Sequence, residues 1–224
     1  MKMKGRQEHK FYINYADYVT LRSRLRAIAQ ADKHTNKDGG YKIRSLYFDN
    51  YMDKAVTEKL AGISRREKFR IRYYNDNIDF IRLEKKAKVN RLTYKESVRI
   101  TKEQCAEILS GNYECLNNEG SSLMLELYAK IRSQALRPKN IVDYDREVYV
   151  YPTGNVRITF DSKVRMSNSV HEFLYPNSVT ILAANAIILE VKYDGFLPEI
   201  IQNIIQVDQR NQTEFSKYVV SRMV

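Results

Sequence analysis

The chain has 224 residues, of which 43% are hydrophobic and 29% charged, a balance typical of a folded domain that excludes a disordered chain. Lysine and arginine number 38 against 27 aspartate and glutamate residues, which gives a formal net charge of +11. This excess predicts an anionic partner, either nucleic acid, an anionic membrane surface or a phosphorylated small molecule, with a merely soluble basic surface as the alternative.

The first half of the sequence predicts one helix among five strands. Residues alternate in character in Arg6–Asn14, which predicts a strand, and apolar side chains recur at helical spacing in Ala16–Ala29. A loop rich in Asn, Asp and Gly follows at Lys33–Gly40. Four further strands are expected, the last three joined by turns at Asn75–Asn77 and Asn90–Arg91: Tyr41–Asp49, Arg66–Tyr74, Phe80–Val89 and Thr93–Ile100.

The second half predicts two helices, three strands and two closing helices. Thr101–Gly111 has a capping Thr and a closing Gly, and Pro138 stops the next helix, Ser122–Leu136. The segment Arg165–Ala184 shows no clear pattern. The remaining expected elements are strands Asn140–Tyr151, Asn155–Ser162 and Ala186–Tyr193, and helices Pro198–Val207 and Glu214–Arg222. This order predicts an α+β fold dominated by antiparallel hairpins, in a single domain that spans residues 1–224.

Cysteine usage and hydropathy bear on the compartment. Cys105 and Cys115 are the only cysteines, so the sequence predicts neither a disulfide framework nor a zinc site, and a reducing, cytoplasmic compartment is expected. The N-terminal residues contain no apolar run typical of a secretory signal, and no stretch reaches the roughly 18 apolar residues of a spanning helix. We expect no membrane segment in this chain.

Charged side chains recur on one face of several predicted strands, because residues two apart on a strand share a face. The charged or polar faces carry Arg6, Glu8, Lys10, Arg70, Arg72, Arg82, Glu84, Lys86, Lys88, Arg157, Asp161, Glu190 and Lys192. A half-solvated sheet explains any one of these strands. Two features of the set favour another interpretation: the faces carry mainly Lys, Arg and isolated Glu, and the amphipathic helices need the opposite, apolar face to pack on.

These patterns predict an antiparallel eight-stranded β-barrel with helices packed outside and a basic interior. Many cations in an enclosed space are unfavourable unless an anion joins them, and the phosphate groups of a triphosphate or polyphosphate match Arg and Lys. Glu8, Glu84 and Glu190 lie among these cations. Each is either an ion-pair partner or a ligand for a divalent cation that also binds phosphate.

Several strings resemble, in order, the catalytic domain of the vacuolar transporter chaperone (VTC) family, a branch of the triphosphate tunnel metalloenzymes. They run from Arg6 to Tyr218: RQEHKFYI, IRSLYFDN, REKFRIRYYN, IRLEKKAKVNRLTYKES, LRPKNIVDYDREVYV, NVRITFD, ILEVKYDGFLP and FSKY. The resemblance implies a tunnel barrel and ATP-dependent synthesis of inorganic polyphosphate with Mn²⁺ or Mg²⁺. ATP and polyphosphate are then the expected partners; protein partners are not specified.

The resemblance also implies residue roles. Arg70 and Arg72 match the arginines that hold nucleotide phosphates, and Glu190 matches the metal-binding glutamate, with Glu8 and Glu84 as further candidate metal ligands. The catalytic candidates are Arg70, Arg72, Lys86, Lys95, Arg146, Arg157 and Lys217. The substrate-binding candidates are Lys10, Arg70, Arg72, Lys86, Lys88 and Lys192.

One position departs from the wider superfamily, whose triphosphatase and cyclase branches carry Glu-x-Glu-x-Lys on the first strand. Here the same spacing reads Arg6-Gln7-Glu8-His9-Lys10, so an arginine replaces the first glutamate. This change favours a polymerase that binds a phosphate chain. A tunnel-fold triphosphatase and a non-catalytic polyphosphate or nucleic-acid binding module are the alternatives.

The remaining candidates carry less weight in the sequence. No RNA-recognition aromatic signature or helix-turn-helix pattern is present, so nucleic acid is not the expected partner. His9, His34 and His171 are expected at the surface or in packing roles. Tyr73 or Tyr74 is the candidate for contact with an adenine.

Overall fold

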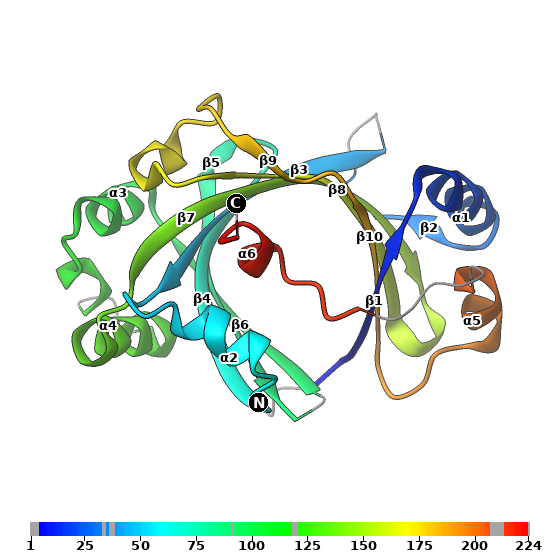
Figure 1. Cartoon of the computed structure of the whole chain (residues 1–224), viewed down its shortest axis with the longest axis horizontal. Coiled ribbons are helices and arrows are strands. Elements are labelled where there is room, and N and C mark those ends of the chain that lie inside the picture. Colours follow the sequence, from blue (N-terminus) through cyan, green and yellow to red (C-terminus); the bar gives the residue numbers. More distant parts are fainter. Residues whose placement is uncertain are drawn as a thin grey trace.

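The computed structural model describes residues 5–32, 35, 39–90, 92–117, 121–206 and 213–223, which form a mostly antiparallel sheet with helices, an α+β fold (Figure 1). The strands are β1 (Gln7–Ile13), β2 (Gln30–Ala31), β3 (Gly40–Asp49), β4 (Arg65–Tyr74), β5 (Asn77–Val89), β6 (Leu92–Ile100), β7 (Arg137–Tyr151), β8 (Val156–Ser167), β9 (Ile181–Ala184) and β10 (Ile187–Tyr193). The α-helices are α1 (Tyr15–Ile28), α2 (Lys54–Leu60), α3 (Lys102–Ser110), α4 (Ser122–Gln134), α5 (Glu199–Ile205) and α6 (Lys217–Val220). Three short 3₁₀ turns are η1 (Glu114–Leu116), η2 (Thr153–Asn155) and η3 (Val170–Leu174).

The sheet is curved, and its two edge strands approach each other. Its main path runs β1-β10-β8-β7-β3-β4-β5-β6, with β2 on β7 and β9 on β8. Across the described residues, β1 and β6 meet only at an isolated bridge, where Arg6 and Thr93 exchange backbone hydrogen bonds of 3.3 and 3.4 Å. The predicted closed barrel is therefore wrong: the sheet curls but does not close.

The C-terminal segment explains why closure stops at one bridge. Thr213 N donates a 2.8 Å hydrogen bond to Lys10 O, and Lys10 Nζ donates one of 3.1 Å to Phe215 O. This segment therefore occupies the free edge of β1, where a ladder to β6 would have formed. Backbone groups at a strand edge need partners, and here a single chain segment supplies one in place of a neighbouring strand.

Apolar side chains on the convex face pack under the helices, as the alternating pattern predicts. One core cluster joins β3, β4 and β5 to α3 and α4, and includes Ile71, Leu83 and Leu127. A second cluster joins β1, β8 and β10 to α1 and α5, and includes Leu21 and Val191. The charged alternates of these strands are left on the concave face.

Local signals position the outer helices. Asn14 and Asp17 form a capping box at the start of α1, and Thr101 and Gln104 form one at the start of α3. Gly111 ends α3 in the left-handed conformation, with φ 85°, which a glycine adopts without strain. The predicted capping Thr and closing Gly are confirmed.

The last helix differs from the prediction of helices outside the sheet. α6 is short and lies on the concave side, within the curl of the sheet (Figure 1). Phe215 and Tyr218 join a third apolar cluster with Tyr47 and Tyr144. Two polar contacts hold α6 there: Tyr218 Oη donates to Asp49 Oδ2 at 2.8 Å, and Asn140 Nδ2 donates to Ser221 Oγ at 2.7 Å.

Several elements were not predicted. The pattern-free segment Arg165–Ala184 contains the end of β8, η3 and β9, and α2 had no sequence signal. The N-cap residue of α2, Asp53, has a left-handed backbone with φ 49° and makes no capping hydrogen bond with its side chain. None of the residues of α2 is buried. Arg91, Val207 and part of the expected loop Lys33–Gly40 lie outside the described residues. None of the described helices is long and apolar enough to cross a membrane.

We expect Tyr218→Phe to lower the free energy of unfolding by about 1–3 kcal/mol, because the buried Asp49 carboxylate loses a hydrogen-bond donor. Urea unfolding followed by tyrosine fluorescence measures the effect. Tyr51→Phe is the matched control, since Tyr51 is 80% exposed. Equal stability of Tyr218→Phe and wild type would show that apolar packing alone holds α6.

Candidate active site

Glu84 is the centre of one charge cluster on the concave face. It lies opposite Arg70 in the β4–β5 ladder. Arg70 Nε and Nη2 lie 2.8 and 2.7 Å from Glu84 Oε2, Lys95 Nζ lies 2.5 Å from Oε1, and Arg72 Nη1 lies 3.9 Å from Oε2. Burial would raise the pKa of Glu84, but these three cations lower it, so the carboxylate is ionised.

Hydroxyl groups from β3 and β7 orient the two arginines. Arg72 Nε donates to Ser45 Oγ at 2.9 Å and its Nη2 donates to Tyr144 Oη at 2.8 Å, while Arg70 Nη1 donates to Tyr47 Oη at 3.2 Å. These partners were not predicted from the sequence, because Tyr and Ser among apolar residues are typical of core positions. Their place on the charged side follows only from the pairing of β3 with β4 and β7.

Asp161 is the centre of a second charge cluster. Arg146 binds it with two hydrogen bonds, 2.6 Å from Nε to Oδ1 and 2.7 Å from Nη2 to Oδ2, and Lys217 Nζ lies 2.5 Å from Oδ2. Burial would raise the pKa of Asp161, but Arg146 and Lys217 lower it to about 2. Asp161 therefore connects α6 to β7 and β8.

Glu8 and Glu190 form a pair of carboxylates that is surrounded by lysine side chains. Lys10 Nζ lies 2.8 Å from Glu8 Oε1 and 3.5 Å from Glu190 Oε1. Lys86 Nζ lies 2.8 Å from Glu8 Oε2, and Lys192 Nζ lies 3.0 Å from Glu190 Oε2. Burial and the nearby Glu190 would raise the pKa of Glu8, but Lys10, Lys86 and Lys192 lower it to about 2. The same kind of balance holds the pKa of Glu190 well below its usual value.

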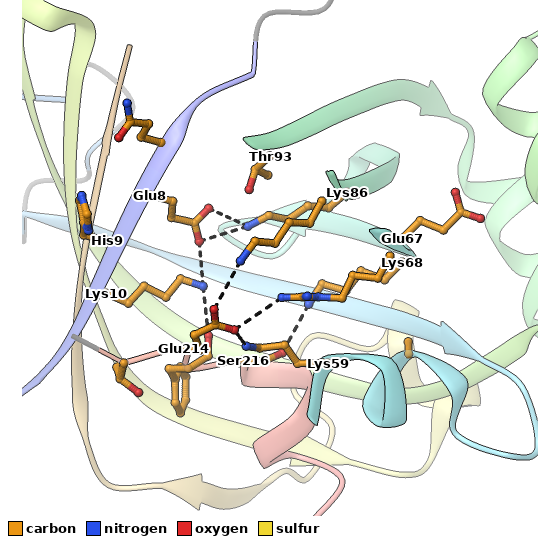
Figure 2. Close-up of a pocket in the computed structure, with 16 residues that line it drawn as sticks. Glu8, His9, Lys10, Lys59, Glu67, Lys68, Lys86, Thr93, Glu214 and Ser216 are labelled. Carbon is orange, nitrogen blue, oxygen red and sulfur yellow. Dashed lines mark hydrogen bonds and ion pairs between the residues drawn. The ribbon is translucent and has the colours of Figure 1, made fainter. Parts of the chain in front are cut away.

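A cavity of about 480 Å³ opens beside Glu8 (Figure 2). Its lining includes three glutamates, Glu8, Glu67 and Glu214, against six cationic side chains: Lys10, Lys59, Arg66, Lys68, Lys86 and Lys88. Figure 2 shows Glu67 directed away from the other labelled side chains, and Glu67 pairs instead with Lys85 and Lys130. The cavity is therefore strongly positive.

Lys68 is the least compensated of the described cavity cations. Its Nζ lies 3.4 Å from Ser216 Oγ and 5.4 Å from the centre of the Tyr47 ring, and no described carboxylate pairs with it. The pKa of Lys68 is lowered to about 7, chiefly by burial. Tyr47 raises this pKa, whereas Lys86, Lys10 and Arg70 lower it further. Burial would raise the pKa of Tyr47, but Arg70, Lys68 and Arg72 lower it to about 7. The lowered pKa of Tyr47, which the three cations cause against the effect of burial, indicates more positive than negative charge at this place.

Most of the predicted site residues are brought together. Linked ion pairs connect Lys86, Glu8, Lys10, Glu190, Lys192, Arg146, Asp161 and Lys217. Arg70, Arg72 and Lys95 share Glu84. Lys88 pairs with Glu214 at 3.4 Å. Arg157 binds outside these groups, with Nη1 2.5 Å from Asp32 Oδ2 and Nη2 3.0 Å from Tyr41 Oη.

The other candidates are placed as follows. His9 packs on Tyr193, with 2.7 Å between its Nε2 and Tyr193 Oη, and is directed away from the cavity in Figure 2. His171 lies in η3, and His34 lies outside the described residues. Tyr73 as an adenine contact is wrong, because it is buried in the convex core and donates to Phe173 O.

Four charged residues that face the cavity were not predicted from the sequence: Lys59, Arg66, Lys68 and Glu214. Arg66 and Lys68 share the period-two face of Arg70, so that signal was present in the sequence. Lys59 comes from α2 and Glu214 from the C-terminal segment, for which strand periodicity gives no signal.

The family follows from comparison with known proteins. A family model described as the VTC domain matches residues 5–224. The chain belongs to the VTC domain family. This confirms the family resemblance of its ordered strings. No match was found among curated proteins.

Solved structures show what fold this VTC domain is similar to. A candidate adenylate cyclase from Bacillus halodurans superposes with a TM-score of 0.53 at 14% identity, over 94% of this chain and 96% of that chain. The PH1819 protein from Pyrococcus horikoshii OT3 gives a TM-score of 0.47 at 13% identity, over 97% and 99% of the two chains. At such identities the first match supports the tunnel fold alone.

VTC domains share this fold with proteins that generally depend on a divalent metal, and the donor set here fits one. Glu8 and Glu190 are two ionised carboxylates on neighbouring strands that both contact the Lys10 ammonium. Mg²⁺ is commonly bound through one or two carboxylates together with substrate phosphates. Within the described residues no group of three or more His, Cys, Asp or Glu could hold a metal alone. Phosphate oxygens and water would complete the coordination.

We expect the free energy of unfolding to fall as pH decreases from 4.5 to about 2, the interval between the usual pKa of Glu8 and its value in the fold. A lowered pKa stabilises the folded state above the unfolded pKa, and this stability is lost as pH falls through the folded pKa. The shift corresponds to about 3 kcal/mol. In urea unfolding experiments, we then expect Glu8→Gln to be less stable than wild type at pH 7. Its free energy of unfolding should also change less with pH across this interval. Parallel pH profiles for the two proteins would contradict the ionised state of Glu8.

Proposed function

We propose that this VTC domain is a polyphosphate polymerase that transfers the γ-phosphate of ATP onto a growing chain of inorganic polyphosphate. The observation that carries the proposal is the cavity on the concave face, where six cationic side chains face the carboxylates of Glu8 and Glu214. Crowded cations require an anion to be stable. Polyphosphate is a flexible anion with about one negative charge per phosphate, and Lys and Arg both bind its oxygens.

The arginine cluster is the proposed binding place for the phosphates of ATP. Arg70 and Arg72 are held in fixed orientations by Glu84, Tyr47, Ser45 and Tyr144. Such preorganised donors stabilise charge that develops in phosphoryl transfer without further reorganisation. Lys95 and Lys86 lie opposite each other on β6 and β5 and extend the positive surface toward the cavity.

The transfer itself needs no protein nucleophile. A terminal oxygen of the phosphate chain attacks the γ-phosphorus of ATP, a new P–O–P bond forms, and the bond between the γ-phosphorus and the β,γ-bridging oxygen breaks. The electron pair of that bond leaves with ADP. Lys10, Lys86 and Lys192 would align the chain, and Arg146 and Lys217, which are fixed by Asp161, would support it from the other side.

Glu8 and Glu190 are the proposed holders of Mg²⁺ or Mn²⁺. When bound, the cation neutralises negative charge on the phosphates. Glu84 is placed differently: Glu8 and Glu190 both contact Lys10 and so lie side by side, whereas the contacts of Glu84 are with Arg70, Arg72 and Lys95. We therefore assign Glu84 to orientation of the arginines.

Arg6 is the feature that favours a polymerase over a tunnel-fold triphosphatase. Its Nε lies 2.9 Å from Asp194 Oδ1, and its Nη2 donates to Asn155 O. The residue that carries a carboxylate in the hydrolytic branches is here a cation bonded to the loop after β10. Glu8 and Glu190 thus remain a pair, without the third carboxylate that this position supplies in the hydrolytic branches.

We expect the protein with ATP and Mn²⁺ to produce phosphate chains that a gel resolves, and Arg70→Ala to slow this by about 30- to 1,000-fold, the effect of losing one preorganised donor. Glu190→Gln, which keeps the side-chain shape, should also abolish most activity. Lys102→Ala on the outer helix α3 removes one cation and should leave the rate unchanged. Circular dichroism of each variant checks folding.

The products decide among the alternatives. Orthophosphate as the main product of ATP or tripolyphosphate would establish a triphosphatase. Binding of polyphosphate without consumption of ATP at any metal concentration would establish a non-catalytic binding module. Full turnover by Arg70→Ala would contradict the role of the arginine cluster.

A further inference from the structure

Glu214 places a carboxylate of the protein itself among the cations at the cavity opening. Its Oε1 lies 3.4 Å from Lys88 Nζ, and its Oε2 lies 3.6 Å from Arg66 Nη2 and forms an ion pair with Lys59 (Figure 2). The three cations come from three elements: α2, β4 and β5. The hydrogen bond from Lys59 lowers the pKa of Glu214 to about 2, so the carboxylate is ionised.

The ion pairs of Glu214 differ from those deeper in the sheet. The Glu214 side chain is 63% exposed, whereas that of Glu84 is 1% exposed. Solvent screens an exposed carboxylate, and such pairs contribute little to stability. One exposed carboxylate also leaves three converging cations with an excess of positive charge. The pairs of Glu84 are therefore part of the fold, whereas the pairs of Glu214 can exchange with another anion at little cost.

The cations around Glu214 continue the row that begins at the arginine cluster. Arg66, Lys68, Arg70 and Arg72 are alternate residues on one face of β4, and six residues of strand extend about 20 Å. On β5, Lys88 lies opposite Arg66 and Lys86 lies opposite Lys68. This row is longer than one triphosphate group. A triphosphate bound at Arg70 and Arg72 leaves Lys59, Arg66 and Lys88 without a phosphate.

We propose that Lys59, Arg66 and Lys88 form an outer subsite for a phosphate of a long polyphosphate chain, and that Glu214 is an internal competitor that occupies this subsite until the chain displaces it. The identity of the chain rests on the proposed function, whereas the subsite needs only binding. A carboxylate carries one negative charge, as does one phosphate within the chain. The exchange therefore leaves the charge of the subsite unchanged and frees Glu214 to the solvent.

The competition predicts a dependence on chain length. Removing the charge of Glu214 favours ligands that reach the outer subsite and has no effect on ligands that fill only the deep cluster. Lys68 lies between the two places on β4 and strengthens the continuity of the row.

Isothermal titration of the full chain with tripolyphosphate and with a medium-length polyphosphate, without ATP, tests the proposal. We expect Glu214→Gln to bind the long chain about 3- to 10-fold more tightly than wild type, a difference of at most about 1.4 kcal/mol. Its affinity for tripolyphosphate should equal that of wild type. Lys59→Gln should weaken the long chain only. Glu126→Gln is the matched control, because Glu126 pairs with Lys85 on the outer surface, 2.5 Å from its Nζ, and both affinities should be unchanged.

Three results would overturn the outer subsite. Glu214→Gln could bind long chains no more tightly than wild type, which would make Glu214 a structural ion pair. It could strengthen both ligands equally, which would be a general charge effect. Lys59→Gln could leave long-chain affinity unchanged. Failure of the polymerase proposal is distinguishable, because it appears as missing polymer in the ATP assay while the dependence of binding on chain length persists.

Discussion

Charge compensation on the concave face is the constraint on which the site depends. Buried cations are unfavourable without anions nearby, and strand alternation places Arg and Lys of several strands on this one face. Glu84 joins Arg70, Arg72 and Lys95 of β4 and β6, and Asp161 joins Arg146 of β7 to Lys217 of α6. Each carboxylate thus connects separate elements, so the pairs that balance the charge also fix the positions of the cations around the curled sheet.

The compensation is uneven, and the proposed phosphate ligand would bind where compensation is weakest. Around Glu84 and Asp161, short ion pairs and hydroxyl groups satisfy the arginines. Along the cavity, Lys68 has no carboxylate partner among the described residues, and the cations at the opening share the exposed Glu214. A phosphate chain gains most where positive charge is least balanced. Preorganised arginines at one end and weakly paired lysines at the other suit a donor that is held firmly and a chain that moves past.

The sequence predicted what strand periodicity controls. The placement of Arg70, Glu84 and Lys86 on one face, and of Ile71 and Leu83 on the other, follows from a period of two, and the structure agrees. Periodicity does not describe how the two edge strands of a sheet meet, so the prediction of a closed barrel was wrong. It also gives no information on helices and irregular segments that cover a sheet face. Lys59 and Glu214 were missed for this reason, although Arg66 and Lys68 could have been found from the pattern that identified Arg70.

The C-terminal segment links the incomplete barrel to the composition of the site. A ladder between β1 and β6 would satisfy the edge of β1 but would leave no seam for another segment. Instead, Thr213 bonds to Lys10 O, and the following residues turn into the curl of the sheet. The same run then supplies Glu214 to the cavity opening, Phe215 to the inner apolar cluster and Lys217 to Asp161. The open seam is thus what allows residues distant in sequence from the strands to become part of the charged face, and it places the most weakly held anion of that face at the cavity opening.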